Sequence, residues 1–141
     1  MLKSSHPLNS LNLIDLTHTH APIVDNRGSI LDLAFNTQIS AVTQIFSSAK
    51  SQRANHYHNK TEQYNYVAYG SVVLATRPDF DTQITYTQFS AQSFFLIEKK
   101  EHHALYFLED TLMLVLTIGP RCGKEYESDT VRLQSSLFTV S

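Results

Sequence analysis

The chain has 141 residues, a formal net charge of −2 at pH 7, charged side chains at 17% of its positions and one cysteine, Cys122. This length is typical of one domain that buries a core without disulfides. A single cysteine excludes a disulfide within the chain. The charge excludes the basic surface that binds nucleic acids or anionic membranes. No apolar run before His18 is long enough for a secretory signal or a membrane span, so we expect a cytoplasmic protein.

Short strands separated by turn signals are predicted along the whole chain. Residues 1–10 are polar and are interpreted as a flexible N-terminal arm, and residues 11–141 as a single domain. Gly28, Gly70, Pro78 and Pro120 mark the main turns. The strands are expected at residues 11–16, 29–35, 39–46, 56–58, 64–69, 71–77, 82–89, 93–97 and 112–118, the last of them central and buried. Residues 124–141 are expected to form a mixed-charge tail.

The number and spacing of these strands indicate the fold class. Eight to ten short strands, with no long stretch of helical periodicity, favour an all-β protein. We therefore predict an antiparallel β-barrel or a double-stranded jelly roll.

A pair of histidines dominates the middle of the chain. His56 and His58 flank Tyr57, and because successive side chains of a strand point to opposite faces, both imidazoles are expected on one face. Gln63 follows on the next strand, preceded by Glu62, and either could add an oxygen ligand. Imidazoles with an oxygen donor suit Zn, Ni, Fe, Mn or Cu, and His103 is the candidate third histidine.

These residues resemble the first motif of the cupin superfamily, in which His-X-His is followed by Glu and then Gly. Here Gln63 stands in the Glu position and Gly70 in the Gly position, while His103 matches the final histidine of the second motif. The resemblance implies a cupin β-barrel with His56, His58, Gln63 and His103 as ligands of a divalent metal ion. By strand parity Gln63 faces inward, and Glu62 is the alternative ligand.

A closer resemblance is to the sugar-modifying cupins, namely deoxysugar epimerases, ketoisomerases and cupin domains of capsule-synthesis proteins. It rests on residues 25–29, 53–58, 109–111 and 126–133. It implies isomerase or epimerase activity in sugar or polysaccharide biosynthesis, with a sugar or nucleotide sugar as ligand, and a homodimer.

This resemblance also implies roles for individual side chains. His56 or His58 would be the base that abstracts a proton beside a ketone, with Tyr66 as a further catalytic group across the pocket. From their chemistry and position, Arg53 and Tyr64 are candidates to bind the substrate, the alternatives being a surface ion pair for Arg53 and a core position for the tyrosines. The alternatives are a non-catalytic cupin that binds a small ligand, a metal-dependent dioxygenase, and a vestigial pocket whose histidines bind one another, tyrosines or water.

Overall fold

The computed structural model describes residues 2–3, 23–34 and 37–138. The predicted strand at residues 11–16, and most of the arm predicted at residues 1–10, lie outside the described residues. Leu2–Lys3 forms β1, which pairs in parallel with Tyr86 and Thr87.

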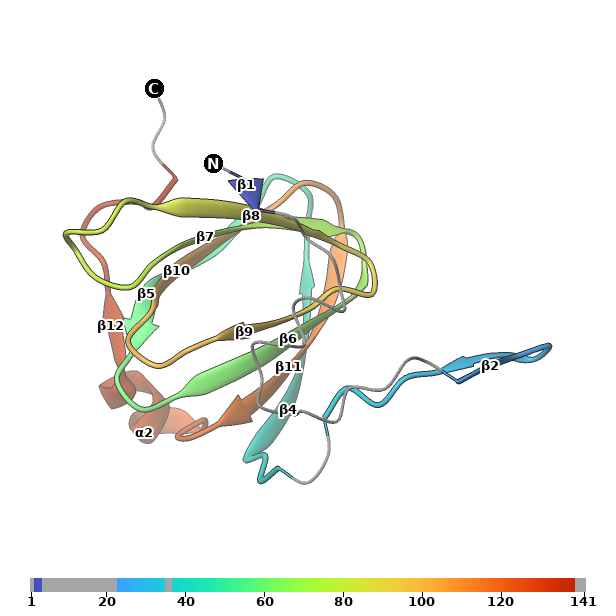
Figure 1. The fold of residues 1–141 in the computed structure, drawn as a ribbon. Coiled ribbons are helices and arrows are strands. Elements are labelled where there is room, and N and C mark those ends of the chain that lie inside the picture. The colour runs from blue at the N-terminus through green and yellow to red at the C-terminus, as the bar shows by residue number, and fades with distance from the viewer. Residues whose placement is uncertain (1, 4–22, 35–36, 139–141) are drawn as a thin grey trace.

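Two β-sheets face each other and enclose the interior of the molecule (Figure 1). The first has the order β1-β8-β7-β10-β5-β12, with β8 at Thr85–Ser90, β7 at Ser71–Arg77, β10 at His102–Phe107, β5 at Gln52–His58 and β12 at Thr130–Arg132. The second has the order β4-β11-β6-β9, with β4 at Ala41–Ser47, β11 at Thr111–Ile118, β6 at Glu62–Tyr69 and β9 at Phe94–Ile97. Apart from the β1–β8 pair, every strand pair in the two sheets is antiparallel.

The core lies between the sheets because the inward positions of both are apolar. Phe89 and Phe95 stack with their ring centroids 4.1 Å apart. The other buried members of this cluster are Val67, Val72, Leu74, Ile97, Leu105, Phe107 and Met113. Burial of such side chains stabilises a fold by about 1.5–3 kcal/mol each.

Gly70 makes the tight connection between β6 and β7. Its φ is +96°, and a Cβ there would lie 2.5 Å from the Asp110 carbonyl oxygen and 2.7 Å from the Thr111 Cα. Only glycine fits this turn, because any side chain would collide with neighbouring backbone.

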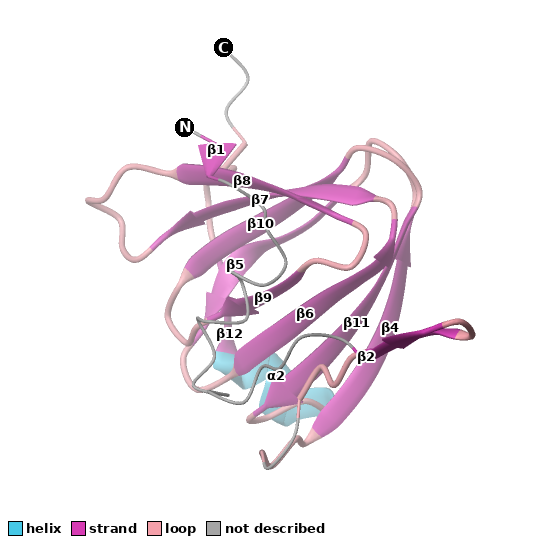
Figure 2. Ribbon diagram, turned by 45° about the vertical axis from the view of Figure 1, so that its right-hand side comes forward, coloured by secondary structure: helices cyan, strands magenta, loops and turns pink. Residues whose placement is uncertain are grey.

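A small hairpin stands away from the two sheets. β2 at Ile23–Asp25 pairs with β3 at Gly28–Ile30, and Figures 1 and 2 show it projecting to one side. All six of its strand residues are exposed, including the apolar Ile23, Val24 and Ile30.

Two sequence-based expectations differ from the structure. The strand predicted at residues 29–35 ends at Ile30. The predicted tail instead contains the helix α2 at Gly123–Asp129 and the strand β12. The sequence does not indicate α2 because a helix of 7 residues is too short to show a helical period. No helix in the described part of the chain has the length and apolar character needed to cross a membrane.

Candidate functional site

Three histidines from two neighbouring strands lie together on the inner face of the six-stranded sheet. β5 carries His56 and His58, and β10 carries His103, which pairs directly with His56. One ring nitrogen of each histidine lies within 4.8 Å of those of the other two. His58 and His103 are buried, whereas His56 is partly accessible. We refer to these three residues as the histidine cluster.

The second nitrogen of two of these rings has a polar partner. Nδ1 of His58 lies 3.1 Å from Oγ1 of Thr130, and Nδ1 of His103 lies 2.9 Å from the carbonyl oxygen of Glu101. Nε2 of His58 is buried and has no hydrogen-bond partner among the described residues. A buried polar atom without a partner is uncommon and marks a place where a ligand or water can bind.

Burial keeps the histidine cluster uncharged. It lowers the pKa of His56 to about 4 and that of His103 to about 3, and in both cases a neighbouring histidine of the cluster lowers it further. Burial also lowers the pKa of His58, and the Arg121 cation adds to this while the Asp129 carboxylate opposes it. At neutral pH all three imidazoles are therefore neutral, with lone pairs free to accept a proton or to bind a metal ion.

A cavity of about 200 Å³ opens beside the cluster. His56 and His103 line it together with Arg53, Gln63, Asn65 and Tyr126. The remaining wall is mostly apolar and is formed by Ile45, Ala54, Ile97, Leu105, Phe107, Met113 and Val115. An apolar cavity with a few converging polar groups is the usual form of a small-molecule site.

A β-bulge in β5 shapes this cavity. Ala54 and Asn55 have φ values of 69° and 62°, and the β5–β10 register shifts at this point, so that Ala104 pairs with Ala54 and His103 with His56. Left-handed backbone at non-glycine residues costs energy and is often found at functional sites. The side chain of Asn55 accepts a hydrogen bond from the backbone N–H of Leu137, 2.9 Å away, which ties the bulge to the C-terminal segment.

Arg53 brings a cation to the cavity wall. Its Nε–H donates to Oγ of Ser47 at 2.7 Å, and an Nη2–H donates to the carbonyl oxygen of Phe46 at 3.0 Å. These bonds fix the guanidinium and use two of its five N–H donors. The remaining donors suit an anionic or hydroxylated ligand.

The structure brings most of the predicted site residues together. His56, His103, Gln63 and Arg53 line one cavity, and His58 lies directly behind it. Gln63 faces the cavity, as its strand parity predicts, whereas the adjacent Glu62 does not line it.

Tyr64 and Tyr66 are not where the sequence analysis placed them. They lie on the outer face of β6, where Tyr64 packs against Phe94 and Leu116, and Tyr66 is part of the same cluster. The expected position across the pocket from the histidines was wrong, because side chains alternate along β6 and an inward Gln63 turns both tyrosines outward.

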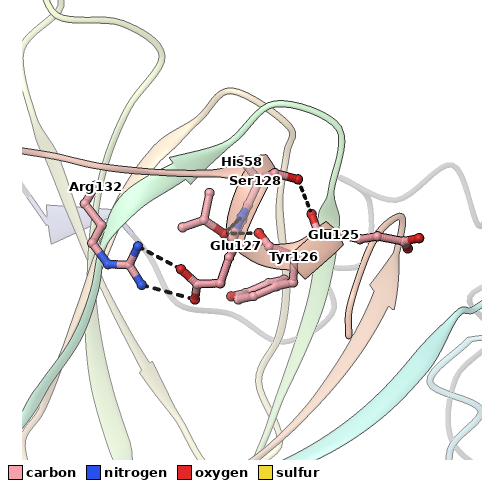
Figure 3. Close-up of polar contacts among 7 residues, drawn as sticks. His58, Glu125, Tyr126, Glu127, Ser128 and Arg132 are labelled. Carbon is pink, nitrogen blue, oxygen red and sulfur yellow. Dashed lines mark hydrogen bonds and ion pairs between the residues drawn. The ribbon is translucent and has the colours of Figure 1, made fainter. Parts of the chain in front are cut away.

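Sequence reasoning missed the contribution of α2. Tyr126 lines the cavity, its ring lies 5.2 Å from that of His58, and the Arg121 guanidinium lies 4.6 Å from its ring centroid. Figure 3 shows Tyr126 beside His58, and the ion pair between Glu127 of α2 and Arg132 of β12. The mixed-charge composition of this segment gives no signal of an inward tyrosine.

Asp129, at the end of α2, fixes the turn between β5 and β6. Its buried carboxylate accepts hydrogen bonds from the backbone N–H of Lys60 and of Thr61 and from the Thr61 hydroxyl, at 2.8, 3.1 and 2.6 Å. This turn joins the strand that carries His58 to the strand that carries Gln63, so Asp129 sets their spacing.

Comparison with known proteins identifies the fold. No protein-family model and no curated protein sequence matches the chain. Among solved structures, the sugar 3,4-ketoisomerase QdtA from Thermoanaerobacterium thermosaccharolyticum, in complex with TDP, is similar at 19% identity and a TM-score of 0.68, over 82% of this chain and 85% of that one. The dTDP-4-dehydrorhamnose 3,5-epimerase of Sulfolobus tokodaii is similar at 13% identity and a TM-score of 0.71, over 86% and 78%.

A third similar structure is the capsular polysaccharide assembling protein CapF of Staphylococcus aureus, at 19% identity and a TM-score of 0.61. The match covers 82% of this chain but 34% of CapF. The chain has the cupin fold. The prediction of an all-β, antiparallel cupin barrel is therefore confirmed, and at these identities the likeness establishes the fold alone.

The histidine cluster also fits a metal ion. Three neutral imidazoles and the amide oxygen of Gln63 are a donor set suited to Zn, Ni, Fe or Mn. The buried Nε2 of His58, which has no partner within the described residues, is the atom that a metal ion would satisfy.

Proposed function

We propose that this cupin is a sugar isomerase or epimerase that moves a proton next to a ketone. The observation that carries the proposal is the histidine cluster, neutral at pH 7, of which His56 and His103 line a cavity of about 200 Å³. The cupin fold shared with sugar 3,4-ketoisomerases and a 3,5-epimerase supports it.

The proposed chemistry needs a neutral base in contact with the substrate. His56 lines the cavity and is neutral, so it takes the proton from the carbon beside the ketone. The C–H electron pair becomes a C=C bond and the carbonyl oxygen gains the negative charge. In an isomerase, His56 then gives the proton to the former carbonyl carbon, while the neighbouring hydroxyl passes its proton to the former carbonyl oxygen and becomes the new ketone. In an epimerase, a proton from water reaches the opposite face of the same carbon, and the imidazolium of His56 releases its proton to water.

The other groups of the cavity assist this step. The neutral ring of His58 lies next to His56, and its Nε2 lone pair stabilises the imidazolium that forms. Arg53 and Gln63 donate hydrogen bonds to the oxygens of the sugar. The mostly apolar wall excludes water and accommodates a deoxygenated part of the ring.

The test uses the probe TDP-4-keto-6-deoxyglucose, a ligand of the related ketoisomerase QdtA. The protein is incubated with this sugar in D2O, and NMR follows deuterium entering the carbons beside the ketone. We expect exchange with the wild-type protein and a loss of about a hundredfold or more with His56→Gln. Tyr66→Phe, on the outer face of β6, should exchange like the wild type. Equal exchange by His56→Gln and wild type would contradict the proposal.

We propose as a second role that the histidine cluster and Gln63 hold a divalent metal ion. The convergence of three ring nitrogens within 4.8 Å supports this role. A bound ion would polarise a ketone, and a redox-active ion would favour the dioxygenase alternative. Elemental analysis of untagged protein prepared without chelator tests it. Near-stoichiometric metal that is lost in the double variant His56→Ala, His58→Ala is expected, and metal-free wild-type protein would contradict it.

We further propose that the chain forms a homodimer. The exposed Ile23, Val24 and Ile30 on the projecting β2–β3 hairpin support this, because a two-stranded hairpin is seldom stable in water without packing. Light scattering should give twice the mass of the chain. Val24→Ser, in the middle of the hairpin, should shift the equilibrium toward monomer, whereas Asp81→Ser, in an exposed loop, should not.

A further inference from the structure

Thr130 stands where α2 ends and β12 begins, directly opposite His58 in the neighbouring strand. It is the C-cap residue of α2, and β12 pairs Thr130 with His58. Both side chains are buried. The hydroxyl of Thr130 therefore contacts the ring of His58 away from water.

The hydrogen bonds of this hydroxyl can be assigned from its donors and acceptors. Oγ1 of Thr130 lies 2.7 Å from the carbonyl oxygen of Tyr126 and 3.1 Å from Nδ1 of His58. A carbonyl oxygen only accepts, and the hydroxyl carries one proton. If that proton went to His58, two oxygens would face each other at 2.7 Å with no hydrogen between them. The hydroxyl therefore donates to Tyr126, and its lone pair faces His58.

This assignment leaves one arrangement for the ring of His58. A lone pair on Oγ1 binds Nδ1 only if Nδ1 carries the hydrogen. A neutral imidazole carries one ring hydrogen, so with that hydrogen on Nδ1 the Nε2 atom presents a lone pair, and this Nε2 is buried with no hydrogen-bond partner among the described residues. We propose that Thr130 is a positioning residue that holds His58 in this tautomer, so that the Nε2 lone pair faces the histidine cluster.

His103 reaches the same tautomer by a different route. Its Nδ1 contacts the carbonyl oxygen of Glu101, which only accepts, so this nitrogen also carries the hydrogen. Here the partner is a backbone atom, which a substitution does not remove. Thr130 is thus the side chain through which the tautomer in the cluster can be changed.

The inference deepens the proposed function and rests on it for its consequence. In the assigned tautomer the Nε2 lone pair of His58 can accept a hydrogen bond from protonated His56, or bind a metal ion. In the opposite tautomer, an N–H would point at the cluster and could do neither. Outer partners that fix a histidine tautomer in this way are typical of reactive and metal-binding imidazoles.

The experiment observes the tautomer itself. Protein with 15N in its histidine rings, treated with EDTA, is studied by long-range 1H–15N NMR at pH 7.5, where protonated and bare ring nitrogens have distinct shifts. The wild-type protein should show His58 with hydrogen on Nδ1 and a bare Nε2. Thr130→Val, which keeps the shape and removes the hydroxyl, should shift His58 toward the other tautomer, and Thr130→Ser should restore the wild-type pattern.

Thr117→Val is the matched control. Thr117 is a buried strand residue whose hydroxyl has no hydrogen-bond partner among the described residues, so its removal should leave the signals of His58 unchanged. A wild-type His58 with hydrogen on Nε2 would overturn the proposal, and so would a wild-type pattern in Thr130→Val. If Thr130→Val does not fold, the wild-type and Thr130→Ser spectra still decide, since both must show the hydrogen on Nδ1.

The proton-exchange assay separates this proposal from the proposed function. Thr130→Val should exchange deuterium about ten- to a hundredfold more slowly than wild type, and Thr130→Ser at close to the wild-type rate. The assigned tautomer in a protein that exchanges no deuterium would contradict the sugar isomerase function and leave the role of Thr130 intact.

Discussion

Arg53 and His56 line the same cavity although they are three positions apart in β5. In a regular strand such residues point to opposite faces. The bulge at Ala54 and Asn55 inserts one residue and restores the parity, so the guanidinium and the imidazole share one wall. The β-bulge thus brings the guanidinium of Arg53 and the proposed base, His56, to the same side of the strand.

Asn55 should be the residue that stabilises this bulge. Asn55→Gly keeps the left-handed backbone but loses the bond to Leu137, and should lower the free energy of unfolding by about 1 kcal/mol. Asn55→Ala should lose about 1 kcal/mol more, because alanine resists positive φ. Urea unfolding measures both. Gln92→Gly, at an exposed position with φ 71°, is the control and should change little. An Asn55→Ala protein as stable as wild type would contradict this role.

Gln63→Glu should strengthen metal binding by the histidine cluster. Gln63 lines the cavity, and a carboxylate attracts a divalent cation more strongly than an amide oxygen does. We expect the affinity for Co²⁺, followed by its visible absorption, to rise about tenfold or more, which is about 1.4 kcal/mol. Glu62→Gln removes a charge from the adjacent residue that does not line the cavity, so it should leave the affinity nearly unchanged. Equal affinities in wild type and Gln63→Glu would argue against Gln63 as a ligand position.

The metal-free protein should lose stability as the pH falls below about 6.5. The unfolded chain takes up protons on its histidines near that pH, whereas folding lowers the pKa of His56 to about 4 and of His103 to about 3. The unfolded state therefore binds more protons between pH 6.5 and these values, and the stability present at pH 7.5 declines across this window. Urea midpoints at pH 7.5 and 5 measure the decline, which should be smaller in His56→Gln. The same decline in that variant would show that His56 is not a source of it.

Asp129→Asn should destabilise the protein by about 2–3 kcal/mol. The buried carboxylate accepts three hydrogen bonds from Lys60 and Thr61, and an amide would turn an NH₂ group toward at least one of these donors. Thermal unfolding measures the loss. Asp110→Asn is the comparison, because Asp110 is exposed and accepts one backbone N–H, from Ala49, and it should cost less than about 1 kcal/mol. Similar losses in both variants would contradict the structural role of Asp129.

The sequence predicts much of the barrel because local signals and tertiary structure agree there. The strand predicted at residues 71–77 is observed as β7 with the same bounds, and the apolar run at residues 112–118 is the interior strand β11. Gly70 is the turn residue that its neighbours require. The histidine pair of β5 points to one side because alternation along a strand follows from backbone geometry alone.

The rest of the site depends on contacts between distant segments. The bulge at Asn55 is stabilised by hydrogen bonds between the Asn55 side chain and the backbone of residues 133–137. The local sequence of β5 gives no signal that predicts a bulge there. Tyr126 reaches the cavity from a helix of seven residues, too short for a periodic pattern. Thr130 contacts His58 through β-strand pairing across the chain, which no spacing rule relates to the His-X-His motif.

The pairing of β5 with β12 also orders events during synthesis of the chain. Thr130 is 72 positions after His58, so the ring of His58 has no fixed orientation until the ribosome has released almost the whole barrel. Contacts between segments so far apart form late and slow the folding of the chain. The strand with its two histidines therefore lacks its β12 neighbour until nearly all of the chain has been synthesised.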